Sequence, residues 1–101
     1  MSFAGTWTVW INSTIGERAF IMIMEQDGES LSGTMKTVGG FGEKLPIQDG
    51  KVEGGRGKWK IGVTQPMPMT LEFDVSVDGN DMEGPVKFGD HFKGRLFGDR
   101  D

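Results

Sequence analysis

The stretch Met69-Thr70-Leu71-Glu72-Phe73-Asp74-Val75-Ser76-Val77 decides the fold of this chain. Apolar residues alternate with polar ones along all of it, the period of two that marks a strand with one buried face. The next two residues, Asp78-Gly79, are a strong short signal for a hairpin turn. An amphipathic strand that ends in a tight turn predicts an antiparallel partner directly after it.

Similar segments precede and follow this stretch. We expect strands over residues 5–13, 17–26, 31–36, 44–48, 51–53 with 57–63 (one interrupted strand or two short ones), 69–77, 82–86 and 92–97. Asp27-Gly28 and Asp49-Gly50 predict further turns, and residues 98–101 are expected to fray. The sequence therefore predicts an all-β fold of about eight antiparallel strands. A closed up-and-down barrel removes exposed strand edges, and a two-sheet β-sandwich is the alternative.

One internal repeat supports these strands. Residues 27–36 and 78–87 both read D-G-x-x-apolar-x-G-x-apolar-K. We interpret the repeat as shared hairpin geometry, in which the later glycine, Gly33 or Gly84, lies where a curved sheet brings two backbones close together.

Length and composition narrow the function classes. The 101 residues fit one domain, residues 1–101. A net charge of −4, with eleven basic residues scattered along the chain, argues against a nucleic-acid partner. The chain has no cysteine, no apolar run long enough for a membrane helix and no secretory signal at its first residues, so we expect a cytoplasmic protein without disulfides or a membrane partner.

Gly5-Thr6-Trp7 at the first strand, with Arg95 or Arg100 near the end of the last, resembles the calycin superfamily, which includes the lipocalins. In that superfamily the tryptophan packs beneath an arginine of the closing strand. The chain also resembles a small bacterial β-barrel domain, found alone or appended to hydrolases, with a G-x-W start and D-G-x-x-L-x-G hairpins. The resemblance implies a barrel and says little about function.

The alternation gives a lumen that is almost wholly apolar. Such a lining suits a hydrophobic ligand, and methionine adapts to irregular ligand shapes. The alternative is that the same side chains fill the lumen as a core. The candidate ligand-binding residues are Trp7, Met35, Trp59, Met69, Leu71, Phe73, Met82 and Phe92.

Catalytic candidates are weak. His91 is the single histidine, and Asp90 beside it could orient it only if both lie in a turn. Glu72 and Asp74 share one strand face and could divide acid and base roles, although an outward, solvated face is the simpler interpretation. One histidine and no cysteine argue against a zinc site, so no metal or cofactor is expected.

The strand over residues 17–26 is apolar on both faces. Ala19, Ile21 and Ile23 alternate with Phe20, Met22 and Met24, so the outer set needs cover, and we expect a homodimer or other homo-oligomer. The alternative is that a neighbouring loop, residues 38–42, folds over this strand. The function favoured by the sequence is binding of a small hydrophobic molecule in the lumen. The alternatives are a cofactor-independent isomerase, cyclase or hydratase, and a packed accessory or oligomerisation module.

Overall fold

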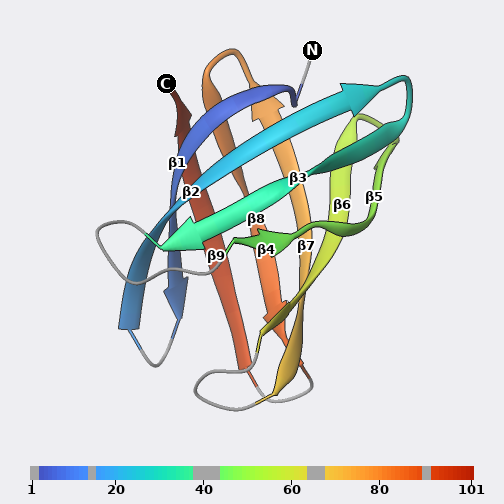
Figure 1. Cartoon of the computed structure of the whole chain (residues 1–101). Helices are drawn as coiled ribbons and strands as arrows, with labels where there is room; N and C mark the ends of the chain where they lie inside the picture. Colours follow the sequence, from blue (N-terminus) through green and yellow to red (C-terminus); the bar gives the residue numbers. More distant parts are fainter. Residues whose placement is uncertain (1–2, 14–15, 38–43, 64–67, 90–91) are drawn as a thin grey trace.

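The computed structural model describes residues 3–13, 16–37, 44–63, 68–89 and 92–101 (Figure 1). The strands are β1 (Gly5–Ser13), β2 (Gly16–Asp27), β3 (Ser30–Thr37), β4 (Leu45–Pro46), β5 (Gln48–Glu53), β6 (Arg56–Val63), β7 (Met69–Asp78), β8 (Asp81–Phe88) and β9 (Phe92–Arg100). Antiparallel pairing runs around the ring β1-β2-β3-β5-β6-β7-β8-β9 and back to β1, and β4 is a short addition beside β3. The predicted all-β, up-and-down barrel of eight strands is confirmed, and the sandwich alternative is wrong.

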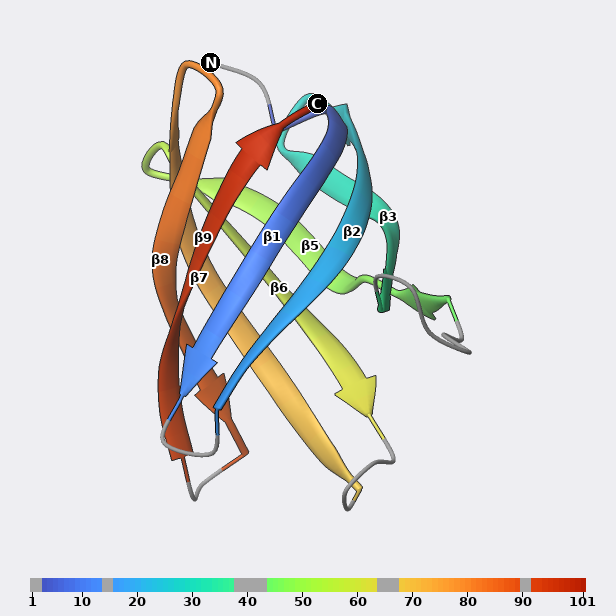
Figure 2. The ribbon, with the colours of Figure 1, turned by 90° about the vertical axis from the view of Figure 1, so that its left-hand side faces the viewer.

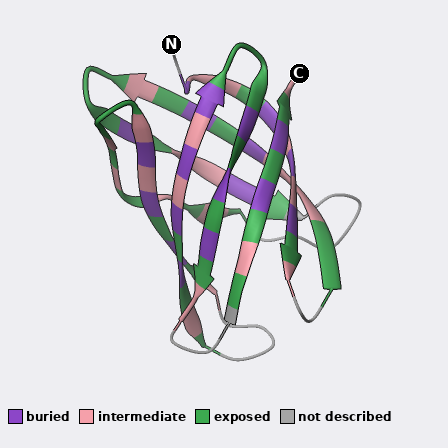
Figure 3. Ribbon diagram, turned by 180° about the vertical axis from the view of Figure 1, so that it is seen from behind, coloured by how far each residue is buried: buried purple, intermediate pink, exposed green. Residues whose placement is uncertain are grey.

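Buried and exposed residues alternate along the strands (Figure 3). On β7, Leu71 and Phe73 are buried, whereas Thr70 and Glu72 are exposed. On β2 the structure settles which side is inside: Met22 and Met24 face the lumen, and the outer set contains Ile23. The buried apolar core comprises Phe3, Trp7, Val9, Ile11, Met22, Met24, Leu31, Met35, Trp59, Ile61, Leu71, Phe73, Val75, Val77, Met82, Val86 and Leu96.

The repeated motif has the predicted geometry. Gly28 and Gly79 each take a φ of 63° as the first of two turn residues, a conformation that glycine adopts without strain. A Cβ on Gly33 would lie 2.0 Å from the carbonyl oxygen of Ile23, and one on Gly84 would lie 2.2 Å from that of Asp74. Each motif glycine therefore lies where the neighbouring strand leaves no room for a side chain.

The turn predicted at Asp49-Gly50 is wrong. Both residues lie within β5, where Asp49 has a φ of 53° and the pairing with β6 shifts register between Gln48 and Lys51, as in a β-bulge. The chain instead reverses at residues 54–55, two glycines with φ of 60° and 79°, so that 51–53 and 57–63 belong to two strands of one hairpin. The strand expected over 44–48 is divided between β4 and the start of β5.

The fraying predicted for the C-terminus is also wrong. β9 continues to Arg100, which pairs with Trp7 of β1. Beyond it, the backbone N–H of Asp101 donates a hydrogen bond to the carbonyl of Thr6 at 2.8 Å. The last residues thus close the barrel against its first strand.

The barrel has two different ends. The β2–β3, β5–β6 and β7–β8 hairpins lie at one end with the start of β1 and the end of β9, and we call it the hairpin end (Figure 1). The last residues of β1, β6 and β8 lie at the opposite end, called the loop end (Figures 1 and 2). Within the described ranges there is no helix long and apolar enough to cross a membrane.

Candidate functional site

The hairpin end of the lumen is closed by the start of the chain. Phe3 is only 2% exposed, and its backbone N–H donates to the side-chain oxygen of Gln26 at 2.8 Å. The indole N–H of Trp7 donates to the carbonyl of Phe3 at 3.0 Å. These bonds hold Phe3 and Trp7 in place at the hairpin end, where both side chains are buried.

An arginine packs on Trp7 at this end of the barrel. The guanidinium carbon of Arg100 lies 4.3 Å from the centre of the Trp7 ring, and the same group donates to the carbonyls of Ala4 and, at 3.1 Å, Gly79. Arg95, the other arginine that the resemblance allowed, instead lies 6.0 Å from the Phe97 ring. The arginine over the G-x-W tryptophan is therefore Arg100.

Six of the eight predicted ligand-binding residues are buried in the lumen. Trp7, Met35 and Met82 are at most 1% exposed, and Trp59, Leu71 and Phe73 at most 5%. Met69 is half-buried at the loop end, and the side chain of Phe92 lies outside the described part of the structure. The inward direction of the described residues is as predicted, and the near-complete burial means that they fill the lumen against one another. Their role in binding stays a prediction.

Trp59 differs from the rest of the lumen. Its ring stacks on Phe73, with centroids 5.3 Å apart and planes 17° from parallel. Its indole nitrogen is buried and has no hydrogen-bond partner, the one such side-chain N or O atom among the described residues. Trp7 shows the contrasting case, since its indole is bonded to Phe3. A sequence cannot reveal such a group, because a missing partner depends on every neighbour in the fold.

Apolar side chains also surround the lumen at the loop end. Phe20, Val63, Met69 and Phe88 pack against the core and are only half-buried. They come from four strands, β2, β6, β7 and β8. The described lumen side chains are thus almost fully buried at the hairpin end and in the middle, and half-buried at the loop end.

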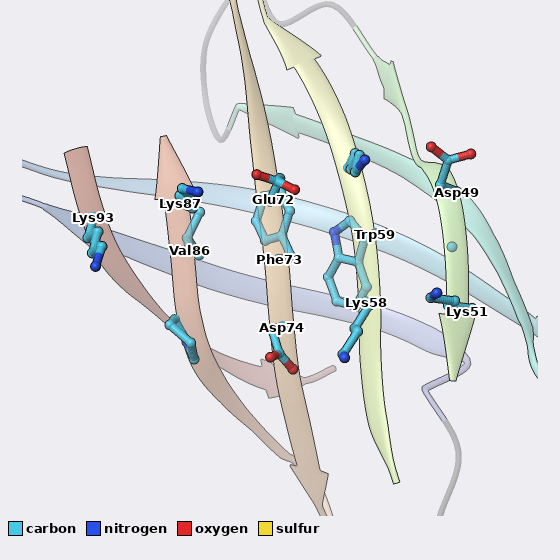
Figure 4. Close-up of a pocket in the computed structure, with 13 residues that line it drawn as sticks. Asp49, Lys51, Lys58, Trp59, Glu72, Phe73, Asp74, Val86, Lys87 and Lys93 are labelled. Carbon is cyan, nitrogen blue, oxygen red and sulfur yellow. The ribbon is translucent and has the colours of Figure 1, made fainter. Parts of the chain in front are cut away.

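Glu72 and Asp74 lie on the outside of the barrel, in an open groove over β5 to β9 (Figure 4). Glu72 is exposed, and a side-chain oxygen of Asp74 accepts a hydrogen bond from Arg56 Nε at 2.6 Å. Neither carboxylate faces the apolar lumen. An enzyme that combines the lumen with these two residues is therefore not supported.

Lysines gather in the same groove. Its lining includes Lys51, Lys58, Lys60, Lys87 and Lys93, although the sequence had suggested scattered basic residues. Cross-strand register brings them together, for example Lys51 opposite Lys58 and Lys87 opposite Lys93. Periodicity within one strand does not reveal which residues of the next strand lie beside it.

Part of this positive charge is compensated. Lys51 and Lys58 lie 3.1 and 3.5 Å from the carboxylate of Glu53. The hydrogen bond from Lys51, followed by the charges of Lys51 and Lys58, lowers the pKa of Glu53. Together with the carboxylates of Glu72 and Asp74, this makes the groove a mixed-charge surface.

The remaining catalytic candidates, Asp90 and His91, lie outside the described residues. Within the described ranges, no group of three or more acidic or histidine side chains is placed to hold a metal ion. No protein-family model matches the sequence, and no curated protein matches it. The candidate site is therefore defined by the lumen, with Trp59 as its polar group.

Proposed function

We propose that the chain binds a small, mainly apolar molecule in its lumen, and that this molecule carries a hydrogen-bond acceptor for the indole N–H of Trp59. The observation behind this proposal is the buried, unpartnered nitrogen of Trp59. Leaving a buried donor without a partner costs about 1 to 3 kcal/mol. A ligand that supplies an acceptor recovers that cost, whereas a wholly apolar ligand does not.

Methionines supply the room that this ligand needs. Four lumen methionines are at most 2% exposed: Met22, Met24, Met35 and Met82. A fifth, Met69, packs against the core at the loop end. Methionine side chains are unbranched and change rotamer at low cost. We therefore expect the site to form as methionines move aside when the ligand enters, because the ligand-free lumen is filled.

The entrance in this proposal is the loop end. Phe3 and Trp7 close the hairpin end, while Phe20, Val63 and Phe88 leave apolar surface partly uncovered at the other. The packing of Arg100 on Trp7 supports membership of the calycin superfamily, whose barrels share this arrangement. The absence of cysteine supports a cytoplasmic location.

Two probes of nearly equal size test the proposal: acetophenone, which has a carbonyl acceptor, and ethylbenzene, which has none. We expect acetophenone to shift the indole N–H resonance of Trp59 in a two-dimensional NMR titration, and to bind about fivefold more tightly than ethylbenzene, since a net hydrogen bond contributes about 1 kcal/mol. The indole resonance of Trp7 is the internal control, because its donor is already bonded.

The variant Trp59→Phe keeps an aromatic ring in the stack on Phe73 and removes the donor. We expect it to bind both probes and to lose the preference for acetophenone. If neither probe perturbs any lumen resonance of the wild-type protein, binding in the lumen is refuted. The packed accessory barrel, which the near-complete burial of the lumen also supports, would then be the better interpretation.

A further inference from the structure

Apolar side chains form a strip on the outside of β9, β1 and β2. Phe97 and Ile23, at its two ends, are 43% and 44% exposed. Trp10, Ala19 and Ile21 lie between them and are half-buried. Figure 2 shows the three strands side by side on one face of the barrel. We call these five residues the outer apolar strip.

Strand register makes the strip continuous. Phe97 is directly opposite Trp10, and Trp10 is directly opposite Ala19. Ile21 and Ile23 are the next outward positions along β2, because alternate residues share a face of a strand. A continuous apolar patch that includes two large exposed side chains is typical of an interaction surface.

Opposite charges flank the strip. Ile21 pairs with Lys36 of β3 on one side and with Thr8 of β1 on the other. Thr8 in turn pairs with Asp99 of β9. One row across the four strands therefore begins with a positive side chain and ends with a negative one, with Ile21 of the strip and Thr8 between them.

We propose that a second copy of this chain docks on the outer apolar strip, with a two-fold axis parallel to the strands and between β1 and β2. Such an axis places β1 of each copy over β2 of the other. Trp10 of one copy then faces the small Ala19 of the other. Lys36 of one copy lies opposite Asp99 of the other. Both contacts occur twice, as in any two-fold interface.

The charges select this axis over the other simple one. An axis across the strands, along the row itself, would place Lys36 on Lys36 and Asp99 on Asp99, and like charges face to face are unfavourable. The outer surface of a closed barrel is convex, so β1 and β2 of each copy pack most closely, and the Lys36–Asp99 pairs lie at the rim of the contact. The small contact predicts a weak dimer, with a dissociation constant in the micromolar range or above.

Sedimentation velocity over a concentration series, from about 5 μM to 1 mM, tests the interface. We expect wild-type protein to shift from monomer to dimer, and Ile23→Glu to remain monomeric over the whole range. Ile23 is already partly exposed, so this change is compatible with folding. Thr70→Glu is the matched control, because it adds the same charge at an exposed position of β7, and it should dimerise like the wild type.

Charge exchange tests the axis separately. Lys36→Asp and Asp99→Lys should each weaken the dimer about tenfold, and the double variant should restore it. Monomeric wild-type protein at 1 mM, or an Ile23→Glu variant that dimerises as tightly as the wild type, would overturn the interface. A double variant no better than either single variant would overturn the axis.

Discussion

At the scale of single residues, Arg100 joins three segments that are far apart in the sequence, and no local pattern predicts these contacts. Its guanidinium lies over Trp7 and donates to the carbonyls of Ala4 and Gly79, while its Nε donates to the side chain of Asn80 at 3.2 Å. These contacts join the start of β1, the β7–β8 turn and the end of β9. The sequence offered two arginines for this place, and only the register of β9 against β1 distinguishes them.

We expect Arg100→Ala to lower the free energy of unfolding by about 2 to 4 kcal/mol. The change removes a cation–π contact and leaves backbone carbonyls near the barrel end without their donor. Urea denaturation measures the loss, with Arg95→Ala as the control on the same strand, where a surface change should cost under about 0.5 kcal/mol. Equal stabilities of the two variants would mean that Arg100 does not hold the closed end.

At the scale of elements, the alternation of β7 and the two D-G hairpins follow from local rules, and the sequence predicted them correctly. Asp49-Gly50 shows where such rules stop. The same dipeptide type lies at a register shift here, and the chain reverses at Gly54 and Gly55 instead. Whether an Asp-Gly pair turns or bulges depends on the partner strand, which no local pattern specifies.

The motif glycines give a prediction for the hairpins. Gly84→Ala should lower the free energy of unfolding by about 3 kcal/mol, because its Cβ would lie 2.2 Å from the Asp74 carbonyl and 2.6 Å from Val75 Cα. Gly33→Ala should be at least as harmful, since Gly33 also has a φ of 145°. Thermal or urea unfolding measures both effects.

The control is Gly62→Ala, on the exposed side of β6. A Cβ there meets nothing within 4 Å, and Gly62 is not among the glycines with positive φ. This substitution should be neutral or stabilise the protein slightly, because alanine restricts the unfolded chain. Comparable losses at Gly62 and Gly84 would show that glycine flexibility, not close backbone approach, explains the motif.

At the scale of the whole molecule, the candidate site depends on contacts between distant residues. The sequence indicated an apolar lumen correctly, because strand alternation sorts side chains to two faces. It did not reveal that Trp59 lacks a partner, that five lysines share one outer groove, or that Phe97, Trp10 and Ala19 form one row. Each of these follows from register around a closed ring, to which every strand contributes.

Two strand pairs that complete the ring, which we call seams, differ in how many residues they pair. The β1–β9 pairing is continuous from Trp7 and Arg100 to Ser13 and Gly94. Between β3 and β5, regular pairing is limited to Ser30 opposite Lys51, helped by a bond from the N–H of Val52 to the carbonyl of Glu29 at 2.7 Å. The bulge at Asp49 interrupts the edge of β5 here, so this seam has fewer regular strand pairs than the one between β1 and β9.

We therefore expect the amides of Ile47 and Val52, which donate to β3 and the turn before it, to exchange with solvent at least about tenfold faster than the bonded amides between β1 and β9. Hydrogen exchange followed by NMR measures this difference. Met35 of β3 lies beside the seam, paired with Leu45, so opening of the seam would also give lumen methionines room to move. Saturating acetophenone should then slow exchange at Ile47 and Val52, because ligand binding favours the closed ring. Equal protection at both seams would show that the barrel opens as one unit and that the bulge does not weaken it.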